Sequence, residues 1–202
     1  MEMDEGLRER KKRETRAAIS AVATALFYER GFENVTVDDV ARAAKVSKMT
    51  VFNYFARKED LMFDRVPEGL ELLRSVLANR GQKSVVTALR DEVRRLVATQ
   101  NVFTKFDSGV LEFWKVVEDS PALRARLREL ADEAREVLAA QCEGPNADLV
   151  ASLLVAGWRA AYRAGLDAAR RGRSPQKAAA ELERVLDATM VAARAAIRAG
   201  NA

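Results

Sequence analysis

The sequence predicts an all-α protein with a small N-terminal domain and a larger C-terminal domain, and three observations support this. Apolar residues recur at three- and four-residue spacing along most of the chain, which is the periodicity of amphipathic helices. No segment shows the alternating pattern of a competing strand. Short helical segments give way to long ones near residue 67, so we expect domains over residues 1–66 and 67–202.

The first predicted helix spans residues 8–30. Ile19, Val22, Leu26 and Phe27 fall on one face of this helix at three- and four-residue spacing. Gly31 follows directly and is typical of the residue that ends a helix.

Two short helices are predicted next. Thr36 precedes the segment "VDDVARAAKV", and Asp39 stands three residues later, which together predict a capping box at the start of a helix. Ser47 is a second N-cap, opening a helix to about residue 55 that buries Val51 and Phe55 at the i, i+4 spacing. The two helices are joined by a tight turn of two or three residues.

A fourth helix is predicted from Arg57, where Glu59 and Asp60 complement the positive end of the helix dipole. Pro67 is expected to kink or end this helix before Gly69. The proline and the glycine together predict a joint at which a shift in the larger domain would change the position of the preceding helix.

Longer helices follow, separated by short breaks rich in Gly, Pro and polar residues. They are predicted at residues 69–79, 83–103, 106–118, 121–142, 146–171 and 175–199. The last two contain the Ala-rich segments "LVASLLVAGWRAAYRAGLDAA" and "AAAELERVLDATMVAARAAI". Small residues permit close helix approach, so this pair suits a four-helix interface between two copies, or equally internal packing in a monomer.

Composition argues against several functional classes without excluding catalysis. The chain contains no histidine, which removes the usual general base and the commonest metal ligand, so we expect no enzyme, no metal site and no cofactor. Its single cysteine cannot form an internal disulfide, and the charged N-terminus lacks the apolar segment of a secretory signal. No apolar run reaches the length of a transmembrane helix. These features predict a cytoplasmic protein.

The segment "VSKMTVFNYFARKEDL", residues 46–61, carries the clearest functional signal. It contains Lys48, Arg57 and Lys58 and three aromatic residues, with no acidic residue between Val46 and Lys58. A second short helix without acids, after a tight turn, predicts a helix-turn-helix whose second helix enters the DNA major groove. Upstream, "LRERKKRETR" carries six basic and two acidic residues, and an arm or helical turn of that charge suits DNA backbone or minor-groove contact.

The stretch "FENVTVDDVARAAKVSKMTVFNYFARKEDL" resembles the DNA-binding region of the TetR family of bacterial transcriptional repressors. By that resemblance, the side chains directed toward base edges are Lys48, Met49, Thr50 and Phe52. Those that hold phosphates are Thr36, Asn53, Tyr54 and Lys58. Two positions depart from the family pattern: Phe52 stands where tyrosine is frequent, and Ala56 where lysine is common.

The resemblance also implies a ligand pocket and a dimer interface in the C-terminal domain. Large aromatic residues gather there, together with two polar candidates for anchoring a charged ligand. The predicted pocket residues are Phe103, Phe106, Phe113, Trp114, Trp158, Tyr162, Glu112 and Arg159. Each aromatic residue can equally serve ordinary core packing.

Taken together, these features predict a ligand-responsive transcriptional regulator, a repressor that binds a palindromic double-stranded DNA operator as a homodimer through its last two helices. A small apolar or amphipathic effector would release it from DNA. The alternative is a helical small-molecule binding or acyl-transfer protein whose basic motif is incidental. Salt-dependent DNA binding separates the two classes, because an enzyme or carrier should show none.

Overall fold

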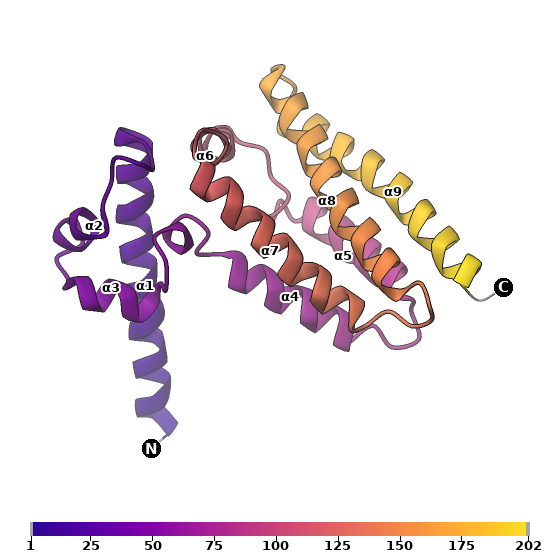
Figure 1. Ribbon diagram of the computed structural model, residues 1–202, viewed down its shortest axis with the longest axis horizontal. Helices are drawn as coiled ribbons and strands as arrows, with labels where there is room; N and C mark the ends of the chain where they lie inside the picture. Colours follow the sequence, from indigo (N-terminus) through magenta and orange to yellow (C-terminus); the bar gives the residue numbers. More distant parts are fainter. Residues whose placement is uncertain (1, 201–202) are drawn as a thin grey trace. The chain divides into compact units, whose positions relative to one another are not determined.

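The computed structural model describes residues 2–200, and every regular element in that range is helical (Figure 1). The all-α prediction is therefore confirmed. The α-helices are α1 Glu2–Arg30, α2 Val37–Ala43, α3 Lys48–Tyr54, α4 Val66–Ala78, α5 Val85–Ala98, α6 Ser108–Asp119, α7 Pro121–Ala139, α8 Ala147–Arg170 and α9 Pro175–Gly200. A single 3₁₀ turn, η1, covers Glu59–Leu61. Within this range no helix is both long and apolar enough to cross a membrane.

The chain forms two compact units. The first unit contains the residues up to Val66 together with Glu112–Arg126. The second unit contains Pro67–Leu111 and the residues from Leu127 onward. The predicted division into domains 1–66 and 67–202 stays a prediction.

In the first unit, α1 packs against α2 and η1, and α2 packs against α3. Ile19, Ala23 and Phe27 repeat every four residues and are almost completely buried. The helix ends where predicted, because Gly31 adopts φ +80° and its N–H donates to the Phe27 carbonyl at 2.9 Å. Its start differs from the prediction: the helix begins at Glu2 rather than at Arg8.

The predicted starts of α2 and α3 are confirmed. The Thr36 hydroxyl accepts the Asp39 N–H at 3.1 Å, while the Asp39 carboxylate accepts the Thr36 N–H at 3.0 Å, so the capping box is complete. The Ser47 hydroxyl accepts the Thr50 N–H at 2.9 Å. Between the helices, Lys45 adopts φ +56°, the left-handed conformation that a tight turn needs and that glycine adopts with least strain.

The prediction of a fourth helix from Arg57 to Pro67 is wrong. Only the short turn η1 forms in this segment, and α4 begins afterwards at Val66. Pro67 lies in the first turn of α4, where the N–H that proline lacks has no helical partner in any case. Pro67 therefore begins a helix instead of ending one, and Gly69 lies inside α4. The helix break assigned to these two residues is therefore wrong, and the joint between the domains stays a prediction.

The corner between α6 and α7 is tied to the helix-turn-helix region within the first unit. Ser120, only 2% exposed, donates to the Glu33 carboxylate at 2.6 Å and accepts the Leu123 N–H at the start of α7. Arg126 of α7 forms an ion pair with Asp60 at 2.9 Å. Both pairs join residues that are far apart in the sequence, so α6 and α7 contribute to the folding of the first unit.

In the second unit, α8 and α9 form the longest helix pair and lie side by side (Figure 1). Two glycines of α8 permit close packing. A Cβ atom at Gly157 would lie 2.0 Å from Thr189 of α9, and one at Gly165 would lie 2.3 Å from the Phe106 ring. These two glycines of α8 therefore serve close packing within the unit, and the role of the Ala-rich surface of the pair stays a prediction.

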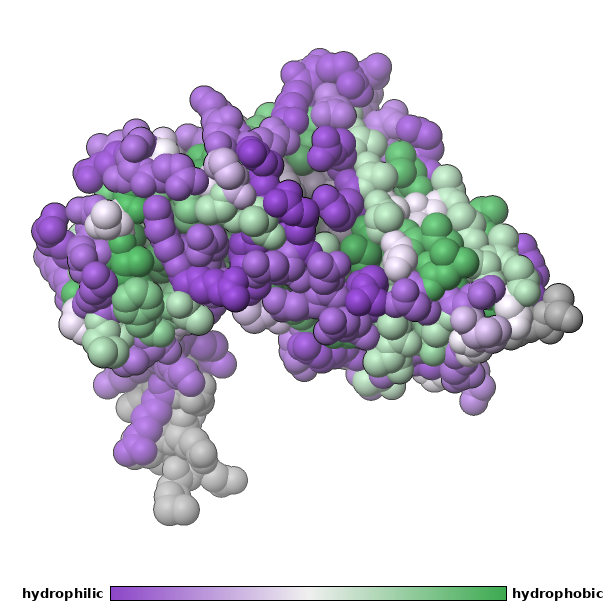
Figure 2. Space-filling view, in the orientation of Figure 1, coloured by the Kyte–Doolittle hydropathy of each residue, from purple (hydrophilic) through white to green (hydrophobic). Residues whose placement is uncertain are grey.

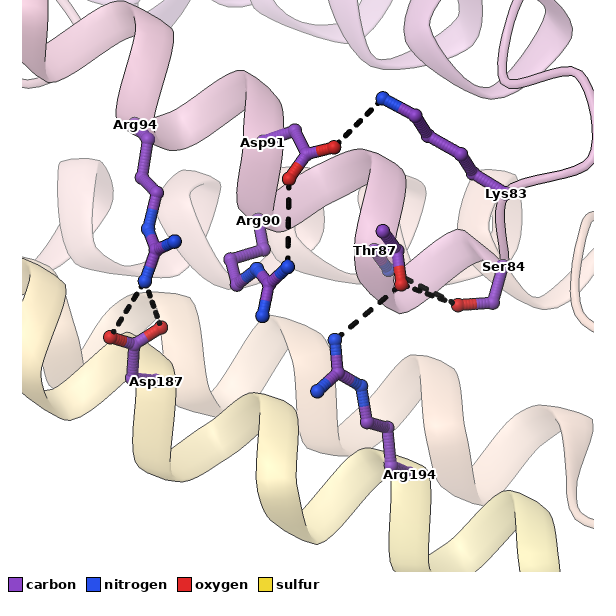
Figure 3. Close-up of polar contacts among 8 residues, drawn as sticks. All are labelled: Lys83, Ser84, Thr87, Arg90, Asp91, Arg94, Asp187 and Arg194. Carbon is purple, nitrogen blue, oxygen red and sulfur yellow. Dashed lines mark hydrogen bonds and ion pairs between the residues drawn. The ribbon is translucent and has the colours of Figure 1, made fainter.

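A polar seam joins α5 to α9 in the same unit (Figure 3). Arg94 donates to both carboxylate oxygens of Asp187, at 3.2 and 3.3 Å. Arg194 of α9 donates to the Thr87 hydroxyl at 3.4 Å. Exposed ion pairs contribute about 1 kcal/mol or less, so buried apolar residues of these helices supply most of the stability.

Candidate nucleic-acid interface

The short helix α3 has one buried side and one exposed side. Val51 and Phe55 are buried, at 1% and 2% exposure, as the i, i+4 spacing predicted. On the opposite side lie four exposed residues that we call the outer face of α3: Lys48, Met49, Phe52 and Asn53. Met49 is 69% and Phe52 43% exposed, although large apolar side chains are usually buried in a folded protein. The outer face is therefore free to contact a partner.

Lys48 has an acidic partner that lies on the preceding helix. Its Nζ lies 2.8 Å from the Asp38 carboxylate of α2, and both side chains remain about half exposed. Sequence reasoning had considered only residues 46–58, which contain no acid, and missed this pair. Since an exposed ion pair is weak, Lys48 can exchange Asp38 for another acceptor at small cost.

The two threonines predicted to contact DNA, Thr36 and Thr50, take part in helix caps. The Thr36 hydroxyl donates to the Asp39 carboxylate at 2.6 Å, and this hydrogen bond is the main cause that lowers the pKa of Asp39 below its ordinary value. The Thr50 hydroxyl pairs with the Ser47 hydroxyl at 2.8 Å. Each oxygen keeps acceptor capacity for a further contact. Their DNA roles stay predictions.

Lys58 has a structural partner in the first unit. Its Nζ donates to the Phe32 carbonyl at 2.6 Å and lies 4.1 Å from the centroid of the Phe32 ring. Burial lowers the pKa of Lys58, and the charges of Glu33 and Glu59 partly offset that effect. The ammonium group thus contacts the loop after α1, and its role as a phosphate contact stays a prediction.

Arg16 is a structural residue that the sequence reasoning placed in a basic arm. Its guanidinium donates to the carbonyls of Tyr54 and Asp64 and lies 4.2 Å from the centroid of the Phe55 ring. Arg16 precedes the buried Ile19 by three residues, so the helical periodicity could have placed it on the inner face of α1.

The other described basic residues of this stretch differ from Arg16. The exposed ones are Arg8, Arg10, Lys11, Lys12 and Arg13. They lie on the N-terminal half of α1, which extends beyond α3 in Figure 1. Because this stretch is helical rather than an extended arm, it suits contact with phosphates more than insertion into a minor groove.

Comparison with known proteins shows what the helix-turn-helix region is similar to. The family model described as "Bacterial regulatory proteins, tetR family" matches residues 19–64, which contain α2, α3 and most of their packing partners. A transcriptional regulator of Mycobacterium tuberculosis, MftR, is 31% identical over 131 residues, or 64% of this chain and 65% of that protein. Residues 19–64 are therefore similar to the DNA-binding region of TetR-family regulators.

Two further proteins are similar to this chain. The regulator TcmR of Streptomyces glaucescens is 43% identical over 56 residues, which cover 28% of this chain and 25% of that protein. The matched regions therefore span less than two thirds of either curated relative. A solved complex of SmeT with triclosan has the same fold, with a TM-score of 0.59 and 16% identity, and the match covers 89% of this chain and 91% of SmeT.

The residues predicted to form a TetR-type effector pocket fall into two groups. In the second unit, Tyr162 contacts both Phe106 and Trp158, with ring centroids 5.1 and 5.9 Å apart. Phe103 lies in the same unit, beside Gly69 of α4. Arg159 belongs to α8 and is exposed.

The second group belongs to the first unit. Phe113 contacts Trp114 and also Phe63, with centroids 5.7 and 6.0 Å apart. Glu112 lies at the start of this part of α6 and is exposed. Phe113 therefore packs within the first unit, and the pocket that would include all eight predicted residues stays a prediction.

Proposed function

We propose that this chain is a TetR-family, ligand-responsive transcriptional regulator, a repressor, that binds double-stranded DNA with α3 in the major groove. The observation that carries the proposal is the outer face of α3, where Met49 and Phe52 are exposed beside Lys48 and Asn53. An exposed apolar and basic surface on a short, firmly capped helix suits a groove lined by thymine methyl groups and phosphates.

The chemistry of the outer face and of the neighbouring, partly exposed Thr50 supports direct reading of bases. Lys48 can donate to the guanine acceptors O6 and N7, and Thr50 can hydrogen-bond or contact a thymine methyl group. Met49 and Phe52 can make only apolar contacts with bases. Seven residues of helix are about 10 Å long, a length that fits within a major groove about 12 Å wide.

Binding of a palindromic operator would require a homodimer, for which α8 and α9 offer the surface. Leu149 of α8 and Val191 of α9 are 50% and 64% exposed, although both are large and apolar. Exposed alanines of α9 continue this surface at Ala188, Ala192, Ala195 and Ala199. Apolar side chains gather over these helices in Figure 2. Two copies of the pair would form a four-helix interface and set two half-sites about 34–36 Å apart, or a longer helical multiple.

The effector is proposed to be small and apolar or amphipathic. Phe106, Trp158 and Tyr162 form an aromatic cluster in the second unit, the surface chemistry that binds such molecules. The solved SmeT structure of the same fold is a complex with triclosan. An effector that binds more tightly to the DNA-free state would lower DNA affinity, and DNA would lower effector affinity by the same factor.

Selection of genomic fragments by the purified protein tests the proposal. We expect enrichment of short palindromic sites, binding of a selected duplex in preference to a scrambled one, and a steep loss of affinity as salt rises. Absence of any salt-dependent DNA binding would overturn the proposal. That outcome would favour a helical small-molecule binding or acyl-transfer protein.

A further inference from the structure

Arg16 is the basic residue of α1 that faces the interior of the first unit. Its side chain is half-buried, whereas Arg13, one turn earlier on the same helix, is exposed. Both residues carry the same charge, so the difference between them comes from position alone. The three contacts of Arg16 involve Tyr54, Phe55 and Asp64, which all lie at or beyond the C-terminal end of α3.

Arg16 stabilises the end of α3 that the sequence of α3 leaves unsupported. The last carbonyls of a helix have no partner within it, and their partial negative charge favours a cation nearby. The last turn of α3 contains no basic residue of its own. Arg16 supplies this cation from α1, donating to the carbonyl of Tyr54, the final residue of α3. Its guanidinium also covers the ring of Phe55, the C-cap.

A helix of seven residues has little stability of its own, so its orientation depends on these attachments. Ser47 caps the N-terminal end, Val51 anchors the middle, and Arg16 holds the C-terminal end. Without the last attachment α3 can tilt about Val51. Any tilt moves Lys48 and Met49, which lie at the far end of the helix.

We propose that Arg16 is a positioning residue that determines the selectivity of DNA binding without contacting DNA. The inference rests on the proposed function, because it concerns how α3 reads its operator. Hydrogen bonds to base edges depend steeply on distance and angle, whereas contacts with phosphates are less demanding and carry no sequence information. A tilted α3 would therefore lose base contacts and retain most of its sequence-independent affinity.

The test compares Arg16→Gln and Arg16→Lys with the matched control Arg13→Gln in the full-length protein. Fluorescence anisotropy measures affinity for a duplex selected by the wild type and for a scrambled duplex, over a series of salt concentrations. Thermal unfolding establishes that each variant is folded at the assay temperature. The lysine variant keeps the charge but loses the planar fork that reaches two carbonyls at once.

We expect Arg16→Gln to lower affinity for the selected duplex about tenfold, with little change for the scrambled duplex and an unchanged salt slope. Arg16→Lys should also lower affinity for the selected duplex more than affinity for the scrambled duplex. Arg13→Gln should leave selectivity intact, and any loss should affect both duplexes equally. If Arg16→Gln is unfolded at the assay temperature, the selectivity of the folded Arg16→Lys variant tests the inference instead.

Two results would overturn the inference. Equal loss on both duplexes, with a salt slope reduced by about one, would make Arg16 a phosphate contact. Unchanged selectivity in a folded variant with a lowered melting temperature would make its role purely structural. Failure of the wild type to bind any DNA would instead refute the proposed function, so the two failures are distinguishable.

Discussion

The helices α2 and α3 are built alike but carry different charges. Each has seven residues, begins with a hydroxyl N-cap and buries a valine, Val40 in α2 and Val51 in α3. The first turn of α2 contains Asp38 and Asp39, whereas the first turn of α3 contains no acid. Acidic residues stabilise the start of α2 through the helix dipole. The start of α3 lacks this stabilisation. Because no acidic residue lies in its first turn, a polyanion can approach this end of α3.

The largest effect should come from the inner side of α3. Phe55→Ala is expected to lower the free energy of unfolding by about 3–5 kcal/mol, because the ring is almost completely buried. Phe52→Ala, on the outer face of the same helix, should change it by less than about 0.5 kcal/mol. Urea titration of both variants measures the contrast. Similar losses would show that Phe52 is also a core residue.

The next effect concerns the basic side chains of the two helices. Lys48→Ala in α3 should weaken binding to the matched operator by about 1–3 kcal/mol and relax base preference. Arg42→Ala in α2 removes the same charge from an exposed position and should have a smaller effect, equal on all sequences. Binding curves on matched and scrambled duplexes decide between them. Unchanged affinity of the Lys48 variant would refute a base-reading role.

Removing the N-cap of α2 or of α3 should lower stability by similar amounts. Thr36→Ala and Ser47→Ala are each expected to cost about 1 kcal/mol of stability, since each removes an acceptor for a helix N–H. Thr36 takes part in a complete capping box, so its replacement should cost more. Chemical unfolding of the two variants gives the comparison. A larger loss for Ser47→Ala would mean that the capping box adds nothing to the first cap.

The α2 cap should also depend on pH. The folded-state pKa of Asp39 lies below its ordinary value, chiefly because Thr36 donates a hydrogen bond to the carboxylate. Its contribution is therefore present above the ordinary aspartate pKa of about 4 and lost as pH falls through the lower folded value. The stability difference between wild type and Asp39→Ala should narrow over that acidic range. A difference independent of pH would show that ionisation of Asp39 does not matter.

The smallest effect should be a gain in DNA affinity, whereas the preceding variants lose affinity or stability. Asp38→Asn frees Lys48 from its exposed ion pair and removes a negative charge beside α3, so DNA affinity should rise roughly twofold to fivefold. The gain should appear on scrambled as well as matched duplexes and shrink with added salt. Asp64→Asn serves as a control, because it removes one acid from a position outside α2. An affinity unchanged at low salt would mean that the Asp38 pair does not restrain Lys48.

The sequence predicted most of the fold because helix ends depend on local residues. Gly31, Thr36 and Ser47 end or begin helices where predicted, through hydrogen bonds to neighbours at most four residues away. The segment after Arg57 carries equally clear local signals but forms only η1. There Asp60 pairs with Arg126, a residue that no local pattern connects to it.

In the candidate site, too, the sequence predicted the features that depend on local spacing and missed the contacts between helices. The burial of Val51 and Phe55 left the outer face of α3 as the exposed side, which helical spacing alone indicated. The pairing of Lys48 with Asp38 and of Arg16 with Tyr54 crosses from one helix to another. Periodicity within a helix indicates which residues face inward, but it does not identify the partner that they meet.

The contacts of the α6–α7 corner also affect the order in which the protein can fold during synthesis. Ser120 and Arg126 contact Glu33 and Asp60, residues that the ribosome makes 87 and 66 positions earlier. At 5–20 residues per second, translation from residue 66 to residue 126 takes roughly 3 to 12 seconds. Throughout that interval the nascent α1, α2 and α3 lack the polar contacts that complete their unit. A nascent chain arrested before residue 120 should thus be more sensitive to protease in this region than the finished protein.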